Sequence, residues 1–418
     1  MMESIVKNPA LAEQGKLNLE LAERNMSALL KVRERFAKEK PFAGLKIGLA
    51  LHITKETGIL VRTLRAGGAL VAITGCNPLS TQDDVAAALA TEEGVLVFGH
   101  KGESSEEYYN FLNKVIEFDP DITIDDGCDL VTEITTKHPE KIAGLIGGCE
   151  ETTTGIIRLK AMEKDGALKF PMVAVNDNLT KHLMDNYYGT GQSTLDGILR
   201  ASNVLFAGKT MVILGYGSCG KGVSLRARGM GANVIVTEVN PFRALQAKMD
   251  GFRVMKMQDA AKEGDIFITV TGNKHVISVE NMKVMKSGAI MANSGHFDSE
   301  IDVVGLEKFA KQKRRIRPYF DEYAFDGKVL FLAGEGRLIN LAAAEGHPSE
   351  VMSLSFCGQA LACEWLVKNK ASLGAKVYTL PEEIDENISR LQLTAMGIEI
   401  DTLTEEQVKY LSSWNVGT

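Results

Sequence analysis

Two side chains that can exchange a proton, Lys181 and Asp185, are four residues apart in a segment of helical composition. Side chains at positions i and i+4 lie on one face of a helix, so an ammonium and a carboxylate group can meet there. A surface ion pair is the simpler interpretation of this spacing. The alternative is an acid–base pair that binds a hydroxyl group of a ligand and removes its proton.

A glycine-rich turn is the second chemical feature, with the pattern G-x-G-x-x-G from Gly215 to Gly220 after the apolar run Thr210 to Leu214. In nucleotide-binding turns the first glycine permits the tight turn, the second lets a pyrophosphate approach, and the third lets the helix pack on the strand. A second strand, Asn233 to Thr237, leads to Glu238, whose carboxylate can accept both hydroxyls of an adenosine ribose. The order of elements predicts an NAD site, and the nearby Arg243 leaves NADP open.

Polar residues close six apolar runs in the first part of the chain. The runs are LKIGLAL, ALVAITG, VLVFGH, DITIDD, AGLIGG and PMVAVND, and the closing residues are His52 and Thr54, Cys76 and Asn77, His100 and Lys101, Asp125 and Asp126, Glu150 to Thr152, and Asn176 and Asp177. Taken singly, each end is more typical of a helix cap. Because ligands bind beyond the carboxyl ends of parallel strands, the six together predict a binding site on one rim.

Two sheets are needed to position these groups. Apolar runs alternate with amphipathic helices such as 81–90 and 106–118, which is typical of a doubly wound sheet. The glycine-rich unit continues through strand-like 266–270 and 289–292. We therefore expect an α/β protein with two doubly wound Rossmann-like domains, joined by a helical hinge after Asp177.

The remaining patterns predict helices that frame these sheets. Leu17 to Lys38 reads as one amphipathic helix, and Ser349 to Asn369 reads as a long apolar helix with Ser349 as its N-cap. Two short helical patterns, Glu382 to Met396 and Thr404 to Trp414, close the chain. They have no core of their own, so we expect an arm that docks on another protomer.

Composition narrows the range of partners. The 418 residues suit two or three domains, and a formal net charge of −7 argues against a basic surface for nucleic acid or an anionic membrane. The N-terminus lacks the apolar core of a signal peptide, and no uncharged apolar run is long enough to span a bilayer, so we expect a cytoplasmic protein. Six cysteines without a C-x-x-C pair predict buried reduced thiols and no metal site.

From about Lys40 to Trp414 the chain resembles the S-adenosylhomocysteine hydrolase family. The resemblance rests on His52-x-Thr54-x-Glu56-Thr57, Ser80-Thr81-Gln82-Asp83, Asp125-Asp126-Gly127, Glu150-Glu151-Thr152-Thr153-Thr154-Gly155, Val175-Asn176-Asp177, Asp185-Asn186-x-Tyr188-Gly189, Gly295-His296-Phe297-Asp298, Glu335-Gly336-Arg337-Leu338-x-Asn340-Leu341 and Gly346-His347-Pro348-Ser349. It implies a substrate-binding domain of residues 1–177 and 348–377, an inserted NAD-binding domain of residues 178–347, and an oligomerisation arm of residues 378–418. It also implies a role in one-carbon metabolism and a homotetramer in which each protomer holds one tightly bound NAD.

The resemblance implies reversible hydrolysis of S-adenosyl-L-homocysteine to adenosine and L-homocysteine. In this family the 3′-hydroxyl is first oxidised by NAD+, the C4′ proton is removed, homocysteine leaves, water adds, and the ketone is reduced again. Lys181 would take the 3′-hydroxyl proton, while Asp185 and Glu151 would hold the ribose hydroxyls. Asp126 with His52 would handle the protons at C4′ and C5′. A lysine acts as a base only when partly neutral, which burial near other cations would favour.

The family motifs assign further residues. The implied catalytic set is His52, Asp126, Glu151, Lys181, Asp185 and His296, with His296 positioning water or the homocysteine sulfur. The implied substrate-binding set adds Thr54, Glu56, Thr57, His347 and Met352, with Thr54, Glu56 and the His347 backbone at adenine. The implied cofactor-binding set is Thr152, Thr153, Thr154, Asn186, Gly215, Gly217, Ser218, Cys219, Gly220, Glu238, Asn240, Asn273, Asn293, Gly295, His296, Asn340 and His347. No motif includes His100, His138, His182 or His275, which we expect to be structural.

Three positions depart from relatives. Animal members end with a lysine and a tyrosine that reach a neighbour's NAD site, whereas this chain ends Trp414-Asn-Val-Gly-Thr418. Thr190 stands where some relatives have cysteine, and Glu345 replaces a methionine that packs on adenine. The alternatives are a hydrolase of S-inosylhomocysteine, an alcohol dehydrogenase that releases NADH, and a non-catalytic NAD-binding regulator. Glu56 predicts adenine over hypoxanthine, because a carboxylate accepts the 6-amine and repels the 6-carbonyl.

Overall fold

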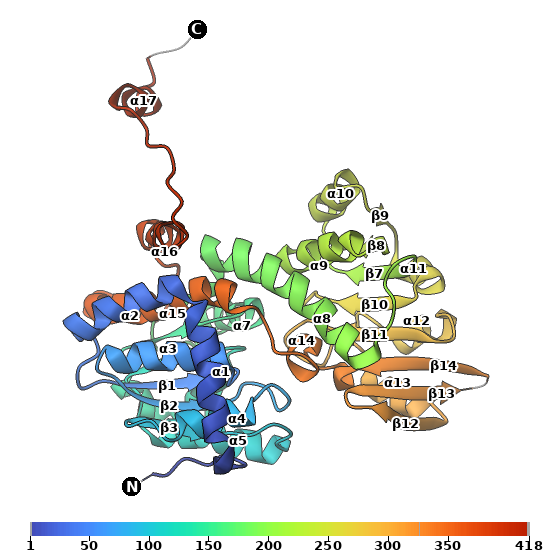
Figure 1. Cartoon of the computed structure of the whole chain (residues 1–418), viewed down its shortest axis with the longest axis horizontal. Helices are drawn as coiled ribbons and strands as arrows, with labels where there is room; N and C mark the ends of the chain where they lie inside the picture. The colour runs from blue at the N-terminus through green and yellow to red at the C-terminus, as the bar shows by residue number, and fades with distance from the viewer. Residues whose placement is uncertain (1, 326, 416–418) are drawn as a thin grey trace.

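The computed structural model describes residues 2–325 and 327–415, which form two lobes and a projecting C-terminal segment (Figure 1). Met1, Asp326 and residues 416–418 lie outside the described residues. They include the first residue of the expected substrate domain, one residue of the expected NAD domain and the end of the expected arm. Each lobe is built on a largely parallel sheet between layers of helices.

The first sheet has the order β15-β6-β5-β4-β1-β2-β3, and all its strands are parallel. Its strands are β1 (Lys46–Ala50), β2 (Leu70–Thr74), β3 (Val95–Phe98), β4 (Ile122–Asp125), β5 (Gly147–Glu150), β6 (Met172–Ala174) and β15 (Val377–Tyr378). Its helices are η1 (Pro9–Leu11), α1 (Ala12–Arg24), α2 (Ser27–Glu39), α3 (Lys55–Ala66), α4 (Asp83–Leu89), α5 (Ser105–Glu117), α6 (Asp129–Lys137), η2 (Pro139–Gly144), α7 (Thr153–Lys164) and α15 (Ser349–Asn369). The strand order reverses between β1 and β4, which is where doubly wound sheets bind ligands.

The second sheet has the order β12-β13-β14-β11-β10-β7-β8-β9. Its strands are β7 (Thr210–Leu214), β8 (Asn233–Thr237), β9 (Arg253–Val254), β10 (Ile266–Thr269), β11 (Ala289–Asn293), β12 (Gln312–Arg317), β13 (Phe320–Phe325) and β14 (Lys328–Ala333). Its helices are α9 (Ser218–Gly229), α10 (Pro241–Met249), α11 (Met257–Glu263), α12 (Val279–Val284), α13 (Val303–Phe309), η5 (Gly334–Gly336) and α14 (Ile339–Ala342). The neighbouring strands β14, β11, β10, β7, β8 and β9 are parallel to one another. Strands β13 and β12 add an antiparallel edge. The predicted fold of two doubly wound Rossmann-like domains is confirmed.

The strands form where apolar side chains are buried on both faces of the sheet. In β1, Leu49 packs in the core beneath α1 to α4 and α15, whereas the next residue, Ala50, packs on the opposite face against α5 and α6. Strands that are covered on both faces show continuous rather than alternating apolar residues. This is why the short apolar runs of the sequence predicted their positions.

Some expected elements differ in the structure. The single helix expected from Leu17 to Lys38 is wrong, because α1 ends at Arg24 and α2 begins at Ser27. Met26, between them, is fully buried, so the apolar pattern continues across the break and hides it. The strand expected at 143–148 begins only at Gly147, because η2 occupies the preceding residues.

The chain passes between the lobes through η3 (Val175–Asp177), η4 (Thr180–Gly189) and α8 (Thr190–Ser202), and it returns between α14 and α15. The ten residues of η4 form a π-helix. Such turns are rare and are frequent at functional sites. The element that carries Lys181 and Asp185 is therefore irregular and lies at the junction of the lobes.

The C-terminal segment has two parts. Helix α16 (Glu382–Ala395) packs on its own protomer, with Ile388 in the same core as α2 and α15. Helix α17 (Glu405–Leu411) projects from the body (Figure 1). Tyr410 and Leu411 at its end and Trp414 just after it are exposed. Among the described residues, no helix is both long and apolar enough to cross a membrane.

Candidate active site

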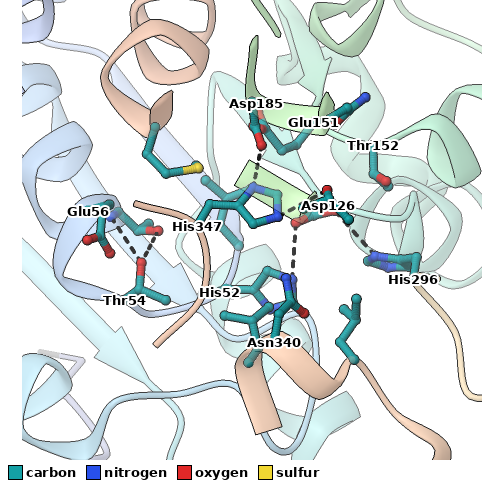
Figure 2. Close-up of a pocket in the computed structure, with 18 of the residues that line it drawn as sticks. His52, Thr54, Glu56, Asp126, Glu151, Thr152, Asp185, His296, Asn340 and His347 are labelled. Atoms are coloured by element: carbon teal, nitrogen blue, oxygen red, sulfur yellow. Dashed lines mark hydrogen bonds and ion pairs between the residues drawn. The ribbon is translucent and has the colours of Figure 1, made fainter. Parts of the chain in front are cut away.

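His52 and Asp126 follow β1 and β4, the neighbouring strands at which the order of the first sheet reverses. His52 Nε2 lies 3.4 Å from Asp126 Oδ2. From the other lobe, Nδ1 of His296 lies 3.5 Å from Asp126 Oδ1 (Figure 2). One carboxylate therefore lies between two imidazoles, and residues from both lobes form this group of three.

The second ring nitrogen of His52 fixes its tautomer. Ser80 Oγ lies 2.7 Å from Nδ1 and donates its own proton to the carbonyl oxygen of Asn77 at 2.9 Å. With the Ser80 proton directed to Asn77, Nδ1 carries a proton and donates to Ser80, which leaves Nε2 as an acceptor that faces the site. The Cys76 sulfur also lies 3.2 Å from Nδ1. Burial lowers the pKa of His52 to about 4, against the opposing attraction of Asp126. At neutral pH His52 is an uncharged base.

Lys181 and Asp185 form a buried cluster with Glu151, so the surface ion pair is excluded. The Lys181 ammonium lies 2.5 Å from Asp185, 3.0 Å from Glu151 and 3.2 Å from the Asn186 side-chain oxygen. Burial lowers the pKa of Lys181, but Asp185 and then Glu151 outweigh it, and the net pKa is raised. The groups that raise the pKa of this described residue are the two carboxylates and not the expected cations, so Lys181 is charged before substrate binds.

Glu151 is held from α15 by two residues that the sequence did not single out. The Ser355 hydroxyl donates to Oε1 and the Gln359 amide donates to Oε2, both at 2.5 Å. Burial raises the pKa of Glu151, against the opposing attraction of Lys181. In the sequence, the only indication of this role was that Ser355 and Gln359 form a polar pair, four residues apart, in a largely apolar helix.

Asp125 and Glu150, which close β4 and β5, turn back into the protein. Glu150 accepts the backbone N–H groups of Gly127 and Thr152, each at 2.9 Å. Asp125 accepts the N–H of Val131 at 2.9 Å, and burial raises its pKa to about 7. These two acids hold the loops that present the neighbouring Asp126 and Glu151.

Glu56 lies at the opposite end of the same cavity, in the first turn of α3. It is 2% exposed and accepts a hydrogen bond from the Ser349 hydroxyl at 2.7 Å. The expected capping role of Ser349 is therefore wrong, because its hydroxyl group is used on Glu56 and Pro348 occupies the N-cap. The Lys55 ammonium lies 3.5 Å from the Glu56 carboxylate.

Glu345 lines the cavity edge, but its carboxylate is paired with two cations. Lys55 Nζ lies at 2.8 Å and Arg200 Nη1 at 3.3 Å. Elsewhere in the cavity, His347 Nδ1 is paired with Asp185 Oδ1 (Figure 2). The Nε2 atom of His347 lies 3.3 Å from the Thr190 hydroxyl. These contacts join the loop before α15 to both lobes.

A second, larger cavity of about 660 Å³ adjoins the first along the glycine-rich turn. This volume is within the range of ligand pockets. Gly215 has a φ of +111°, as the tight turn requires, and a side chain at Gly220 would meet the Gly215 carbonyl. A methyl group on Gly217 would meet nothing closer than Arg243 at 3.8 Å, which leaves the backbone open to a pyrophosphate. Glu238 lines the cavity, so the residues fit NAD.

Most predicted site residues line one of the two cavities. The first is lined by His52, Thr54, Glu56, Thr57, Asp126, Glu151, Lys181, Asp185, Asn340, His347 and Met352, the second by Thr153, Thr154, Gly215, Gly217, Ser218, Glu238, Asn273 and Gly295, and both by Thr152, Asn186, Cys219 and His296. Gly220, Asn240 and Asn293 line neither. Asn240 caps α10, and the Asn293 side chain bonds to the backbone of Gly295, Phe297 and Gly336, which fixes the turn before His296. His182, expected to be structural, lines the second cavity and lies 2.9 Å from Ser218 Oγ.

The trio of His52, Asp126 and His296 also has the ligand types of a metal site. Their nearest ligand atoms lie within 4.8 Å of one another. The same arrangement serves proton transfer without a metal, and the expectation that the protein has no resident metal stays a prediction.

Comparison with known proteins agrees with this geometry. The model of S-adenosyl-L-homocysteine hydrolase matches residues 3–141, and the model of its NAD binding domain matches residues 186–346. S-inosyl-L-homocysteine hydrolase of Methanocaldococcus jannaschii is 58% identical over 99% of each chain. Adenosylhomocysteinase of Aquifex aeolicus is 58% identical over 100% of each chain, and that of Thermosynechococcus vestitus is 57% identical over 99% of this chain and 96% of its own.

Solved structures give a more distant likeness. The 3-phosphoglycerate dehydrogenase of Entamoeba histolytica is 15% identical, with a TM-score of 0.45 over 81% of this chain and 100% of that chain. That value is too low to bear on function, whereas the sequence relatives cover nearly the whole chain and the two family models cover most of it. The chain belongs to the S-adenosyl-L-homocysteine hydrolase family and carries its NAD-binding domain, which confirms the family, the enzyme class and the cofactor that the motifs predicted.

Proposed function

We propose that this protein catalyses the reversible hydrolysis of S-adenosyl-L-homocysteine to adenosine and L-homocysteine. The observation that carries the proposal is the buried cluster of Lys181, Asp185 and Glu151, which lines the first cavity beside Thr152 and Asn186, two residues that line both cavities. A ribose held there has its hydroxyl groups among a cation and two carboxylates, next to the expected position of the nicotinamide. An alcohol dehydrogenase that releases NADH would not need the separate Asp126 cluster.

Bound NAD would accept a hydride from C3′ and return it at the end of the cycle. The protein has to remove the hydroxyl proton, and Lys181 must first lose its own proton to act as the base. Glu151 is the suitable acceptor, because it lies 3.0 Å away and its pKa is raised. The transfer replaces a buried ion pair by two neutral groups, which a dry site tolerates.

Proton transfer at C4′ and C5′ belongs to the second cluster. Neutral His52 presents Nε2 as an acceptor, and Asp126 can share a proton with it or with His296. The Asp126 carboxylate is the base that we assign to C4′, and it passes this proton to Nε2 of His52, which delivers it to the leaving sulfur. Neutral His52 then takes a proton from the water that adds at C5′ and returns it through Asp126 to C4′. His296 orients the water or the sulfur from the other lobe.

Glu56 supports adenine as the base. Its buried carboxylate can accept a hydrogen bond from the 6-amine, and Glu345 does not compete because its charge is directed to Lys55 and Arg200. One observation favours the second candidate, S-inosyl-L-homocysteine. The Lys55 ammonium beside Glu56 can donate to the 6-carbonyl of hypoxanthine while Glu56 accepts the N1 proton.

Two measurements test these proposals. Adenosine added to the purified protein without free cofactor should give NADH absorbance that stops at one equivalent per protomer, and continuous NADH accumulation would support a dehydrogenase instead.

We expect kcat/KM to favour the adenosyl over the inosyl thioether by up to roughly 10⁴-fold, because a site that pairs with a substrate donor strongly rejects an analogue that lacks this donor. Glu56→Gln should reduce the preference, and Lys55→Met should leave it. An inosyl preference that Lys55→Met abolishes would establish the second candidate.

Assembly and location are further proposals. We infer a homotetramer in which α17 docks on another protomer, because Tyr410 and Leu411 on this helix and Trp414 just after it are exposed and are not covered by their own protomer. The domain division at residues 177, 347 and 377, a cytoplasmic location and a role in one-carbon metabolism are proposed with it. Light scattering of the full chain and of a chain ending at Met396 tests the assembly, and a smaller particle is expected for the shorter chain.

A further inference from the structure

A carboxylate from the C-terminal part of the chain lies at the start of the helix that carries Lys181 and Asp185. Asp385, in α16, accepts a hydrogen bond from the backbone N–H of Leu179 at 2.5 Å and from that of Thr180 at 3.3 Å. The Thr180 hydroxyl group also donates to it. Asp385 is only 7% exposed, although Glu382 and Glu383 in the same first turn of α16 face solvent.

These contacts supply a cap that η4 lacks in its own sequence. The first N–H groups of a helix have no partner within the helix, and a side-chain oxygen of the N-cap residue usually accepts them. The N-cap of η4 is Leu179, whose side chain cannot accept a hydrogen bond. A charged acceptor at this position also interacts favourably with the helix dipole. The cap therefore comes from a residue 205 positions later.

The residue that provides the cap is itself firmly placed. Ile388, one turn further along α16, is fully buried in the core formed with α2 and α15, and Leu380, just before the helix, is 6% exposed. The capped residue, Thr180, directly precedes Lys181. A shift of the start of η4 would move the Lys181 ammonium relative to Glu151, which is on the fixed β5 loop.

We propose that Asp385 is a positioning residue, which holds the start of η4 so that Lys181 and Asp185 meet Glu151 and the ribose. It touches neither substrate nor cofactor. The expected effect of Asp385 on the rate of NADH formation rests on the proposed function, whereas its expected effect on hydrogen exchange in η4 does not. Helix α16 thus positions the catalytic groups in addition to packing on the body of its own protomer.

The test compares Asp385→Asn with Glu383→Gln, which removes an exposed negative charge from the same first turn. Both proteins are prepared with NAD bound, and their oligomeric state and NAD content are checked. Hydrogen–deuterium exchange of peptides that cover residues 179–189 reports on the helix without any substrate. NADH formation after addition of adenosine reports on the oxidation step, and its rate and its half-saturating concentration of adenosine are determined separately.

We expect Asp385→Asn to speed exchange in residues 179–189 and to slow NADH formation by roughly 10- to 100-fold at saturating adenosine, the scale for a displaced catalytic group. Glu383→Gln should match the native protein in both measurements. Thr180→Val, which retains the backbone contacts, should have a smaller effect than Asp385→Asn. Unchanged exchange together with an oxidation rate within twofold of native would overturn the proposal, as would a rate loss that merely follows lower thermal stability. If native protein forms no NADH with adenosine, the proposed function fails, and the exchange measurement still judges Asp385.

Discussion

The Lys181 ammonium lies 3.0 Å from a carboxylate oxygen of Glu151, and the two residues are 6% and 5% exposed. One belongs to the π-helix between the lobes and the other to the loop after β5. The pKa of Glu151 is raised by burial, so this carboxylate is the group most able to take the lysine proton. The contact therefore joins the charge state of Lys181 to that of a carboxylate in the first lobe.

Substitution of Lys181 should separate charge from basicity. Lys181→Ala should lower both NADH formation and hydrolysis by roughly 10²-fold or more, the usual scale for a general base. Lys181→Arg, which retains the charge but cannot lose its proton, should be equally impaired. Glu151→Gln should slow NADH formation because it removes the proton acceptor. Rapid-mixing absorbance with matched NAD content measures all three, and normal hydrolysis by Lys181→Ala would refute the assignment.

The Asp126 cluster should act after the oxidation step. Asp126→Asn keeps the side-chain shape but removes the base, so adenosine should still reduce bound NAD at close to the native rate. Exchange of the C4′ proton with deuterated solvent should slow by roughly 10²-fold or more. Mass spectrometry of recovered adenosine measures this exchange. Equal losses in both steps would place Asp126 in binding rather than in proton transfer.

Stability should depend on pH through His52. Its pKa is lowered from 6.5 to about 4 in the folded protein because burial disfavours the charged ring. The unfolded chain therefore binds the proton first, and stability falls as the pH drops from about 6.5 to about 4, by at most about 3 kcal/mol. Glutamine does not bind a proton in this range, so the His52→Gln protein should lose less stability than the native protein between pH 6.5 and pH 4. Urea unfolding at pH 7 and pH 4.5, with the exposed His275→Gln as control, measures the difference.

The strands were predictable wherever burial on both faces of the sheet leaves a continuous run of apolar residues in the sequence. Strands β7 and β8 match their predicted bounds residue by residue, because a short apolar run ends at a turn in each case. Strand β12 was missed because every residue of Gln312–Arg317 is exposed, so neither a continuous apolar run nor alternation appears in the sequence. Its existence depends on the pairing with β13, which is a tertiary contact.

The site was predictable at the level of residue types but less so in its electrostatics. The spacing of Lys181 and Asp185 indicated their contact, although the backbone between them is a π-helix rather than an α-helix. The sequence could not show that the third member of the cluster is the carboxylate of Glu151 rather than a cation, because Glu151 is thirty positions away. Likewise, the sequence did not show that Asp385 caps this helix, since side-chain contacts over 200 residues follow only from packing.

Two glycines of the nucleotide-binding turn should respond in opposite ways to the same substitution. A methyl group on Gly217 meets no atom closer than 3.8 Å, so Gly217→Ala should leave the folded protein without cofactor about as stable as native. The methyl group would occupy the space above the turn where a pyrophosphate approaches, and NAD affinity should fall by roughly tenfold or more.

At Gly220 the methyl group would lie 2.0 Å from the Gly215 carbonyl oxygen, so the helix must move away from the strand. Gly220→Ala should therefore lower the melting temperature even without cofactor, by several degrees for a cost of roughly 1–3 kcal/mol. Thermal unfolding of cofactor-free protein and titration with NAD separate the two effects. Loss of stability in Gly217→Ala with unchanged NAD affinity would show that this turn does not receive the pyrophosphate.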